Sequence, residues 1–296
     1  GGLLADRFLG QRRAVYIGGT LMAIGHFLMA FESLFFPALG FLIAGNGLFK
    51  PNISTQVGSL YPAGDKRRDS AFSIFYVGVN LGAFLAPLTC GTLGVVFGWH
   101  YGFGLAGVGM MVGLLIYLYG QRYLKPDRLT VRKEGSAEAE EPLTLREKQK
   151  IAALVLLCLL TIPFWAAFEQ QGNTLALWFD SDTDRRVGAW EVPQTWFQSL
   201  NPMFIFTLTP LITAFWAWQA GRGAQPGAIA KMVRGCLLLG ASFLVLVPAG
   251  AWYDVDGTPV SMWWLVGSTL VMTLGELYLS PIGMSMVTKL APARAV

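Results

Sequence analysis

The sequence predicts an all-α membrane protein whose spanning helices form two bundles. Only 14% of its 296 residues are charged, compared with about 25% in soluble domains, while 54% are hydrophobic. The hydrophobic residues occur in long blocks, and a helix needs about 20 such residues to cross the hydrocarbon layer. Strands of a membrane β-barrel would be about ten residues long with alternating polarity, and these blocks are neither. We therefore expect membrane-spanning helices.

The longest polar stretch, 121–148, divides the hydrophobic blocks into two groups of four. This stretch can bury little apolar surface and is typical of a solvated linker. Two helical bundles joined by a crossover are typical of secondary transporters. We expect an N-terminal bundle in 1–120, a linker in 121–148 and a C-terminal bundle in 149–296, with no evident internal repeat. The eight expected spans are 14–36, 39–61, 72–97, 101–121, 149–178, 195–218, 230–250 and 262–290.

Basic residues mark one side of the expected membrane protein. Of the 22 Lys and Arg residues, all except Lys50, Arg185 and Arg186 lie in alternate loops on that side. The positive-inside rule places these loops in the cytoplasm. The sequence thus predicts an integral, multi-pass protein of the inner or plasma membrane, surrounded by the lipid bilayer. The formal net charge of +4 is explained by these loops, so no nucleic-acid partner is expected.

Three ionisable residues, Lys50, Glu169 and Glu276, lie well inside expected spans. A charge at the bilayer centre costs about 2.5–3.5 kcal/mol on insertion scales, so such residues usually face a cavity or a partner. Each one alone could be a packing residue held neutral or half of a static pair. Three together favour a shared aqueous cavity.

Polar residues and prolines accompany these charges at helical spacing. Residues four apart lie on one helix face, and proline withdraws a backbone donor, which is tolerated beside a cavity or protein. A local kink or a hydrogen bond between helices is the alternative for any single residue. Several spans with such features favour a polar pathway. The expected groups are Asn46, Lys50, Pro51 and Ser54; Tyr76, Asn80, Phe84 and Pro87; Trp165, Glu169 and Asn173; Asn201-Pro202, which should break its helix; and Glu276, Ser280 and Pro281.

Enzyme chemistry has little support in the sequence. The two histidines, His26 and His100, lack metal-ligand spacing, and no nucleophile motif or phosphate-binding glycine loop is present. The three cysteines lie in apolar blocks and are interpreted as packing residues. We therefore expect a protein without catalytic activity, metal or cofactor.

Six motifs resemble known transporters. GGLLADRFLGQRR at residues 1–13 resembles the loop between the second and third helices of the major facilitator superfamily. The whole set, in this order along the chain, resembles the proton-dependent oligopeptide transporter family. The other members are GLFKPN at 47–52, FYVGVNLGA at 75–83, FEQQG at 168–172, QSLNP at 198–202 and GELYLSP at 275–281.

The resemblance implies a fold and an activity, and it implies that the chain is part of a larger protein. The eight spans would be helices three to ten of a twelve-helix, two-bundle fold of the major facilitator type. The activity would be symport of di- and tripeptides with protons by alternating access, with the proton as coupling ion and no cofactor. The chain would be a fragment of a larger protein and inactive by itself. The helix-one E-x-x-E-R motif would then lie outside the chain, and 121–148 has no room for the two helices that many bacterial members insert between bundles.

The resemblance also assigns roles to individual residues. It implies that Lys50 binds the peptide carboxylate and couples protons, and that Glu276 pairs with the peptide amino terminus. Glu169 would take up protons. Further substrate contacts would be Tyr76, Asn80, Asn201 and Ser280, proton coupling would use Lys50, Glu169 and Glu276, and a cytoplasmic gate motif would comprise Asp6, Arg7, Gly10, Arg12 and Arg13.

Two rival functions remain open from sequence. Relatives with this fold also carry other small solutes, such as amines, nitrate and other anions. A non-transporting sensor would bind peptide without moving it.

Overall fold

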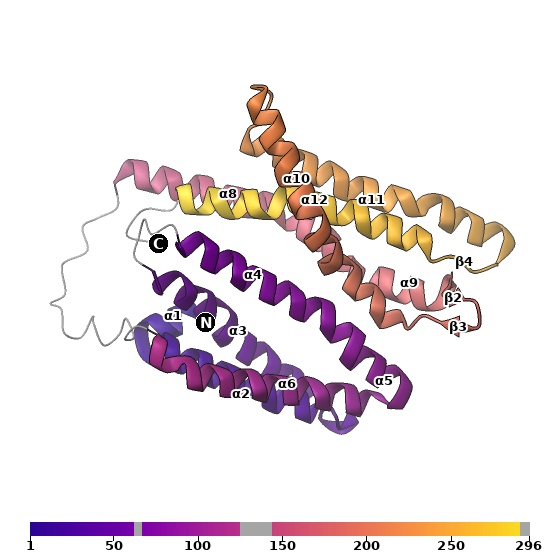
Figure 1. Ribbon diagram of the computed structural model, residues 1–296, viewed down its shortest axis with the longest axis horizontal. Helices are drawn as coiled ribbons and strands as arrows, with labels where there is room; N and C mark the ends of the chain where they lie inside the picture. The colour runs from indigo at the N-terminus through magenta and orange to yellow at the C-terminus, as the bar shows by residue number, and fades with distance from the viewer. Residues whose placement is uncertain (62–66, 125–143, 291–296) are drawn as a thin grey trace. The chain divides into compact units, whose positions relative to one another are not determined.

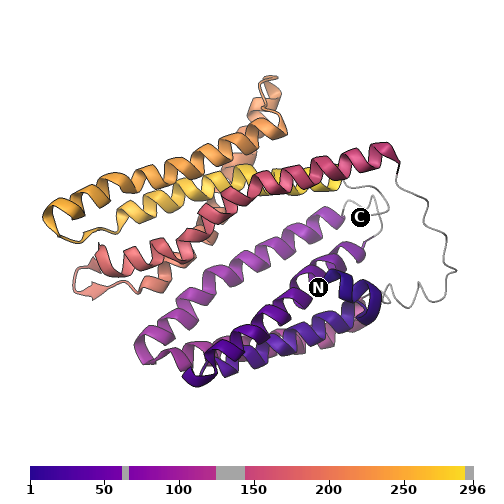
Figure 2. The same ribbon diagram turned by 180° about the vertical axis from the view of Figure 1, so that it is seen from behind.

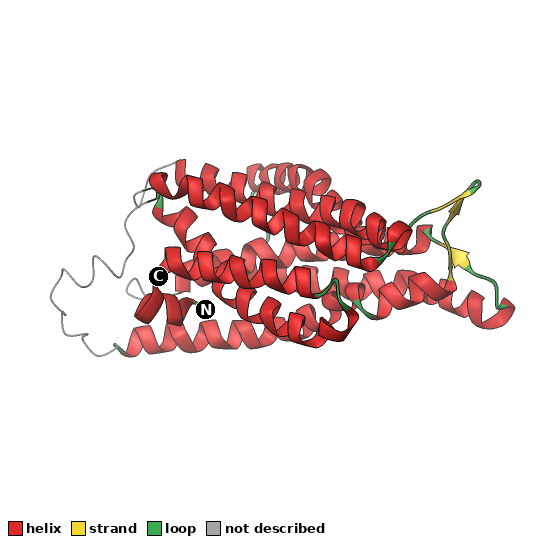
Figure 3. Ribbon diagram, turned by 90° about the horizontal axis from the view of Figure 1, so that it is seen from below, coloured by secondary structure: helices red, strands yellow, loops and turns green. Residues whose placement is uncertain are grey.

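The computed structural model describes residues 1–61, 67–124 and 144–290 (Figure 1). It divides into two compact units, which we call the N-terminal unit (Gly1–Ala139) and the C-terminal unit (Glu140–Val296). The described chain is helical apart from loops and four short strands, which lie in the C-terminal unit (Figure 3). The prediction of an all-α membrane fold is confirmed.

In its described part, the N-terminal unit contains five long or medium helices and several short helical turns. The π-helical turns η1 and η3 precede or follow α-helix without a break, and η2 and η4 are 3₁₀ turns. Its elements are α1 (Gly2–Leu4), η1 (Ala5–Leu9), α2 (Gln11–Leu28), η2 (Glu32–Leu34), α3 (Phe35–Ser59), α4 (Arg67–Ala86), η3 (Pro87–Gly91), α5 (Thr92–Phe97), α6 (Trp99–Gly120) and η4 (Gln121–Tyr123).

The C-terminal unit, between residues 144 and 290, is built from the long helices α8, α10, α11 and α12 with short elements between them. Strands β1 and β4 pair in parallel, and β2 and β3 form an antiparallel pair. Its elements are α8 (Leu145–Phe168), η5 (Glu169–Gly172), α9 (Thr174–Asp182), β1 (Thr183–Asp184), β2 (Arg186–Val187), β3 (Trp190–Glu191), η6 (Gln194–Ser199), α10 (Leu200–Gly221), α11 (Ala228–Asp256), β4 (Val260–Ser261) and α12 (Trp263–Leu290).

Seven helical stretches in the described residues are long and apolar enough to cross a membrane. They correspond to the second to eighth expected spans. The first expected span, 14–36, is wrong in extent because α2 ends at Leu28 and the chain then turns before α3. Apolar residues continue through this turn, so composition alone showed no boundary there. The seven stretches are Glu32–Ser59, Ala71–Phe97, Trp99–Tyr123, Leu145–Asp182, Gln194–Gly221, Ala228–Tyr253 and Trp263–Gly283.

Local signals place several helix ends. Thr144 caps α8 by accepting a hydrogen bond from the Glu147 backbone N–H, while the Glu147 carboxylate accepts one from the Thr144 N–H. This reciprocal pair satisfies two donors that a helix start leaves free, so α8 begins before the apolar block does. Gly257 ends α11 with a φ of 62°, a conformation that glycine adopts without strain.

Close glycine contacts join the main helix pair of each unit. A Cβ on Gly18 of α2 would lie 2.7 Å from the carbonyl oxygen of Gly45 in α3. A Cβ on Gly235 of α11 would lie 2.7 Å from the carbonyl oxygen of Gly275 in α12. Small residues at such crossings let two backbones approach closely in a membrane. Figures 1 and 2 both show α11 and α12 running side by side over most of their length.

The two glycine crossings also share the spacing from a glycine to a proline. Pro51 follows Gly45 at the same interval as Pro281 follows Gly275, each inside its helix. In this register Asn46 corresponds to Glu276, the residue after the glycine.

The crossing of α11 and α12 should not tolerate a side chain at Gly235. Gly235→Ala would force its Cβ against backbone atoms, and overpacking of this kind costs about 1–3 kcal/mol. We expect a lower thermal unfolding midpoint of the purified protein in detergent. Gly240→Ala is the matched control in the same helix, because no atom lies within 4 Å of its Cβ position. Equal midpoints for the two variants would contradict the close crossing.

Candidate functional site

Glu276 lies in a hydrogen-bonded cluster that joins α10 to α12. The Asn201 amide nitrogen donates to Glu276 Oε2 at 2.8 Å and to Thr273 Oγ1 at 3.1 Å. Glu276 is half-buried, and Thr273 is fully buried. The cluster therefore holds a carboxylate at a defined position where two stretches meet that are long and apolar enough to cross a membrane.

Thr273 fixes the direction of the Asn201 amide. Its hydroxyl donates to the backbone oxygen of Thr269 at 2.8 Å, so its oxygen is left as an acceptor. Both amide hydrogens of Asn201 are thus used on α12, and its carbonyl oxygen is left for other partners. Thr273 was not among the predicted site residues, although it lies one turn before Glu276, a spacing that places both on one helix face.

Pro202 does not break α10, contrary to expectation. Ser199 is the N-cap of α10, so Asn201 and Pro202 lie in its first turn. A missing backbone donor costs little there, because the first N–H groups of a helix have no intrahelical partner. The chain changes from 3₁₀ to α geometry just before Asn201, which brings its side chain beside Glu276 at the positive end of the helix dipole.

Glu169 belongs to the same unit as Glu276. It is exposed and begins the 3₁₀ turn η5. The expectation that Trp165, Glu169 and Asn173 share one helix face is wrong at Asn173. α8 ends at Phe168, and Asn173 has a φ of −125° and a ψ of −90°, which interrupt the helix. Among the described residues no group of His, Cys, Asp or Glu could hold a metal ion.

The predicted residues of the N-terminal unit lie on α3 and α4. Lys50 is exposed, and its side chain makes no hydrogen bond or ion pair with any residue that the structure describes. Ser54 donates to the backbone oxygens of Lys50 and Pro51 in its own helix. Asn80 is 7% exposed and donates to the Tyr76 backbone oxygen at 2.9 Å.

A polar contact inside the N-terminal unit was not predicted. Tyr117 of α6 donates from its hydroxyl to Gln56 Oε1 of α3 at 3.0 Å, and Gln56 is buried. Lone polar residues in apolar spans carry no sequence signal of which helix they will meet.

The remaining predicted site residues, Ser280 and the gate motif, do not form one cluster among the described residues. Ser280 lies one turn after Glu276 on α12 and is half-buried. The expected gate motif surrounds the start of α2, where Gly10 has a φ of 80° that favours glycine. Arg12 donates to the Leu124 backbone oxygen and so ties this motif to the end of η4. Its other members, Asp6, Arg7 and Arg13, are exposed.

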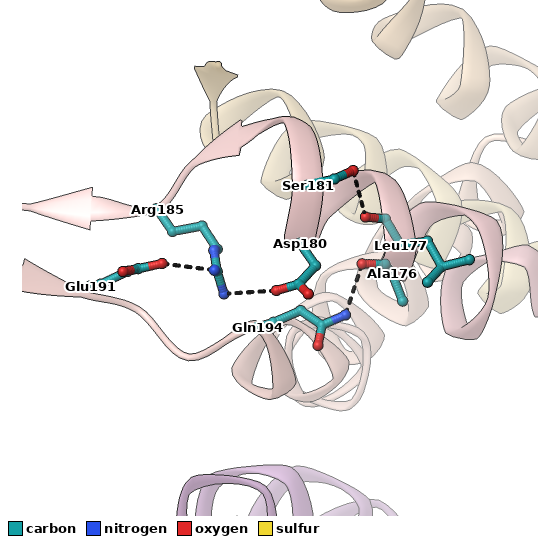
Figure 4. Close-up of polar contacts among 7 residues, drawn as sticks. All are labelled: Ala176, Leu177, Asp180, Ser181, Arg185, Glu191 and Gln194. Carbon is teal, nitrogen blue, oxygen red and sulfur yellow. Dashed lines mark hydrogen bonds and ion pairs between the residues drawn. The ribbon is translucent and has the colours of Figure 1, made fainter. Parts of the chain in front are cut away.

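Arg185 organises the loop between α9 and η6 (Figure 4). It contacts Asp180 at 3.3 Å and Glu191 at 2.7 Å, which joins the end of α9 to β3. Gln194 donates to the Ala176 backbone oxygen at 2.8 Å and fixes the return of the chain. Arg185 was predicted to lie outside the basic loops, and this structural role was not predicted.

The fold and these intramembrane polar residues define an integral, multi-pass membrane protein. The model of the POT family matches residues 12–141 and 140–295. The chain is 36% identical to the peptide transporter YePEPT of Yersinia enterocolitica, covering 99% of this chain and 70% of that protein. It is 33% identical to a di-/tripeptide transporter of Lactococcus lactis subsp. cremoris, covering 99% and 71%. The chain therefore belongs to the POT family, as its motifs predicted.

A solved structure gives the same fold. A POT family transporter in complex with 5-aminolevulinic acid superposes with a TM-score of 0.85 at 30% identity, covering 99% of this chain and 72% of that one. The match to the Yersinia transporter extends over 360 aligned residues, whereas this chain has 296. The relative thus contains residues within the matched region that this chain lacks.

The Asn201–Glu276 contact can be tested by exchanging its two groups. Asn201→Asp places a second carboxylate against Glu276, and the lost hydrogen bond to a charged group is worth about 1.5–3 kcal/mol. We expect the thermal unfolding midpoint to fall at pH 8. It should fall less at pH 5, where the two carboxylates can share a proton. The double variant N201D/E276Q should recover, because the amide introduced on α12 can donate to the carboxylate introduced on α10.

Asn173→Asp is the matched control, since it adds the same charge at an exposed position of the same unit. An equal loss in both single variants, or no recovery in the double variant, would contradict the contact.

Proposed function

We propose that this sequence provides the transport core of a symporter that moves di- and tripeptides with protons across the inner or plasma membrane by alternating access, with the basic loops in the cytoplasm. The family and the names of the peptide-transporting relatives support this proposal. The activity would belong to the longer protein in which the sequence predicts that the chain lies. It requires transport, not catalysis, and no cofactor.

Two incompletely balanced charges carry the proposal. Lys50 has no counter-charge among the described residues, and Glu276 receives a hydrogen bond from a neutral amide. A zwitterionic peptide would supply a carboxylate to Lys50 and an ammonium group to Glu276. We assign Tyr76, Asn80, Asn201 and Ser280 to further contacts with the peptide, Asn201 through the carbonyl oxygen that α12 leaves free.

Proton coupling would use Lys50, Glu169 and Glu276. Glu169 and Glu276 lie in the same unit, and each carboxylate is a candidate to carry the proton. A proton on Glu276 would remove its attraction for the peptide ammonium group. Protonation would then shift the balance of inward and outward states, provided that the two states differ in proton affinity. Asp6, Arg7, Gly10, Arg12 and Arg13 would form the cytoplasmic gate.

A second candidate is symport of another small solute. The structure of a related POT family transporter contains 5-aminolevulinic acid, which also carries an amino and a carboxyl group. Such a solute could satisfy the same two charges. A peptide sensor would instead bind without net uptake.

Uptake of a labelled dipeptide tests the proposed function. In cells that produce the full-length protein, we expect accumulation that a proton ionophore abolishes and an unlabelled tripeptide competes with. Accumulation unaffected by the ionophore would contradict proton coupling. Absence of tripeptide competition would favour another solute, and binding without uptake would favour a sensor.

Lys50→Ala tests the cation of the N-terminal unit. We expect proton-driven accumulation to fall at least tenfold, because one tenfold step corresponds to about 1.4 kcal/mol and a lost charged contact exceeds this value. Exchange of peptide down its own gradient need not be lost. Arg146→Ala is the matched control, as Arg146 is an exposed cation at the start of α8. Wild-type accumulation by Lys50→Ala would remove Lys50 from the coupling mechanism.

A further inference from the structure

A cavity of about 520 Å³ lies between α10, α11 and α12, away from the Glu276 cluster. Its wall is apolar except at Arg234 and Tyr278. Leu237, Leu238 and Ala241 of α11 form one side, and Ile212 of α10 and Leu274 of α12 face them. We call it the α10–α12 groove. Leu274 and Tyr278 alternate with Glu276 along α12, so the groove lies on a different face of that helix from the proposed site.

A second, independent observation lies beside the groove. Lys231 is only 6% exposed, and its ammonium group lies 3.9 Å from the centre of the Trp216 ring. The ammonium group makes no hydrogen bond or ion pair with any described residue. Trp216 contacts Tyr278 of the groove wall edge-on, with ring centres 5.2 Å apart. The Trp216 indole nitrogen is also buried without an acceptor among the described residues.

These groups share one chemical deficit. The Lys231 side chain packs against Trp216, and the cation–π contact uses none of the three donors of its ammonium group, which have no acceptor among the described residues. Lys231 and Arg234 lie three residues apart on α11 and therefore on one helix face. Two cations and an indole N–H therefore lie beside an apolar groove. A ligand that joins an anionic, acceptor-rich group to an apolar chain would match both features.

We propose that the α10–α12 groove binds an anionic phospholipid, with its phosphate at Lys231 and Arg234 and an acyl chain along Leu237, Leu238 and Ala241. Charge complementarity favours a lipid of the cytoplasmic leaflet, because the loop before α11 belongs to the basic side of the protein. This site is distinct from the proposed peptide site.

Lipid binding to the purified full-length protein in detergent tests the proposal by native mass spectrometry. The probes are phosphatidylglycerol, phosphatidylcholine with the same acyl chains, and inorganic phosphate. We expect phosphatidylglycerol to bind at least fivefold more tightly than phosphatidylcholine, and phosphate alone not to compete with it. The double variant K231Q/R234Q should weaken phosphatidylglycerol binding at least fivefold, whereas Arg222→Gln, the matched control outside the groove, should not.

Two further variants keep the test decisive if K231Q/R234Q folds poorly. Lys231→Arg retains the charge and should bind phosphatidylglycerol as the wild type does. Ala241→Phe fills the groove without changing charge and should weaken binding of the lipid. Equal binding of the two lipids, competition by phosphate alone, or unchanged binding by Ala241→Phe would each overturn the proposal. So would absence of phosphatidylglycerol binding, as expected if another segment of the protein fills the groove.

Discussion

The cost of holding a charge inside a bilayer explains the arrangement around Glu276. Such a charge needs donors, a counter-charge or water, because hydrocarbon supplies none of them. Asn201 supplies one donor, and the 2.8 Å contact ties the first turn of α10 to the middle of α12. Thr273 directs that donor, since its own proton is used on the Thr269 carbonyl.

The scaffold that holds this cluster depends on close contact between helix backbones. Lipid provides no hydrophobic driving force for helix association, so packing of small residues has to supply it. Gly235 and Gly275 provide that contact in the C-terminal unit, and Gly18 and Gly45 provide it in the N-terminal unit. Because the same crossing recurs, Asn46 and Glu276 hold corresponding places within their own units.

Much of the fold could be predicted from composition because a spanning helix leaves a long apolar signal. Seven of the expected spans correspond to helical stretches of suitable length and hydropathy. The first differs because residues near Phe31 stay apolar through a turn, and hydropathy does not report backbone direction. The helix break before Asn173 was missed for the same reason. Pro202 was assigned the wrong effect because the cost of proline depends on whether it lies in the first turn or the interior of a helix.

The sequence by itself determined the class of protein, the family and the identity of the intramembrane charges, since each depends on composition or on short motifs in a fixed order. Only the tertiary structure decided which side chains meet. Thr273 joined the Glu276 cluster, and Gln56 met Tyr117, through contacts between helices far apart in the chain. Lys231 became a buried cation beside Trp216 in the same way. The physical reason is that helical spacing specifies the face on which a residue lies, whereas its partner depends on how neighbouring helices cross.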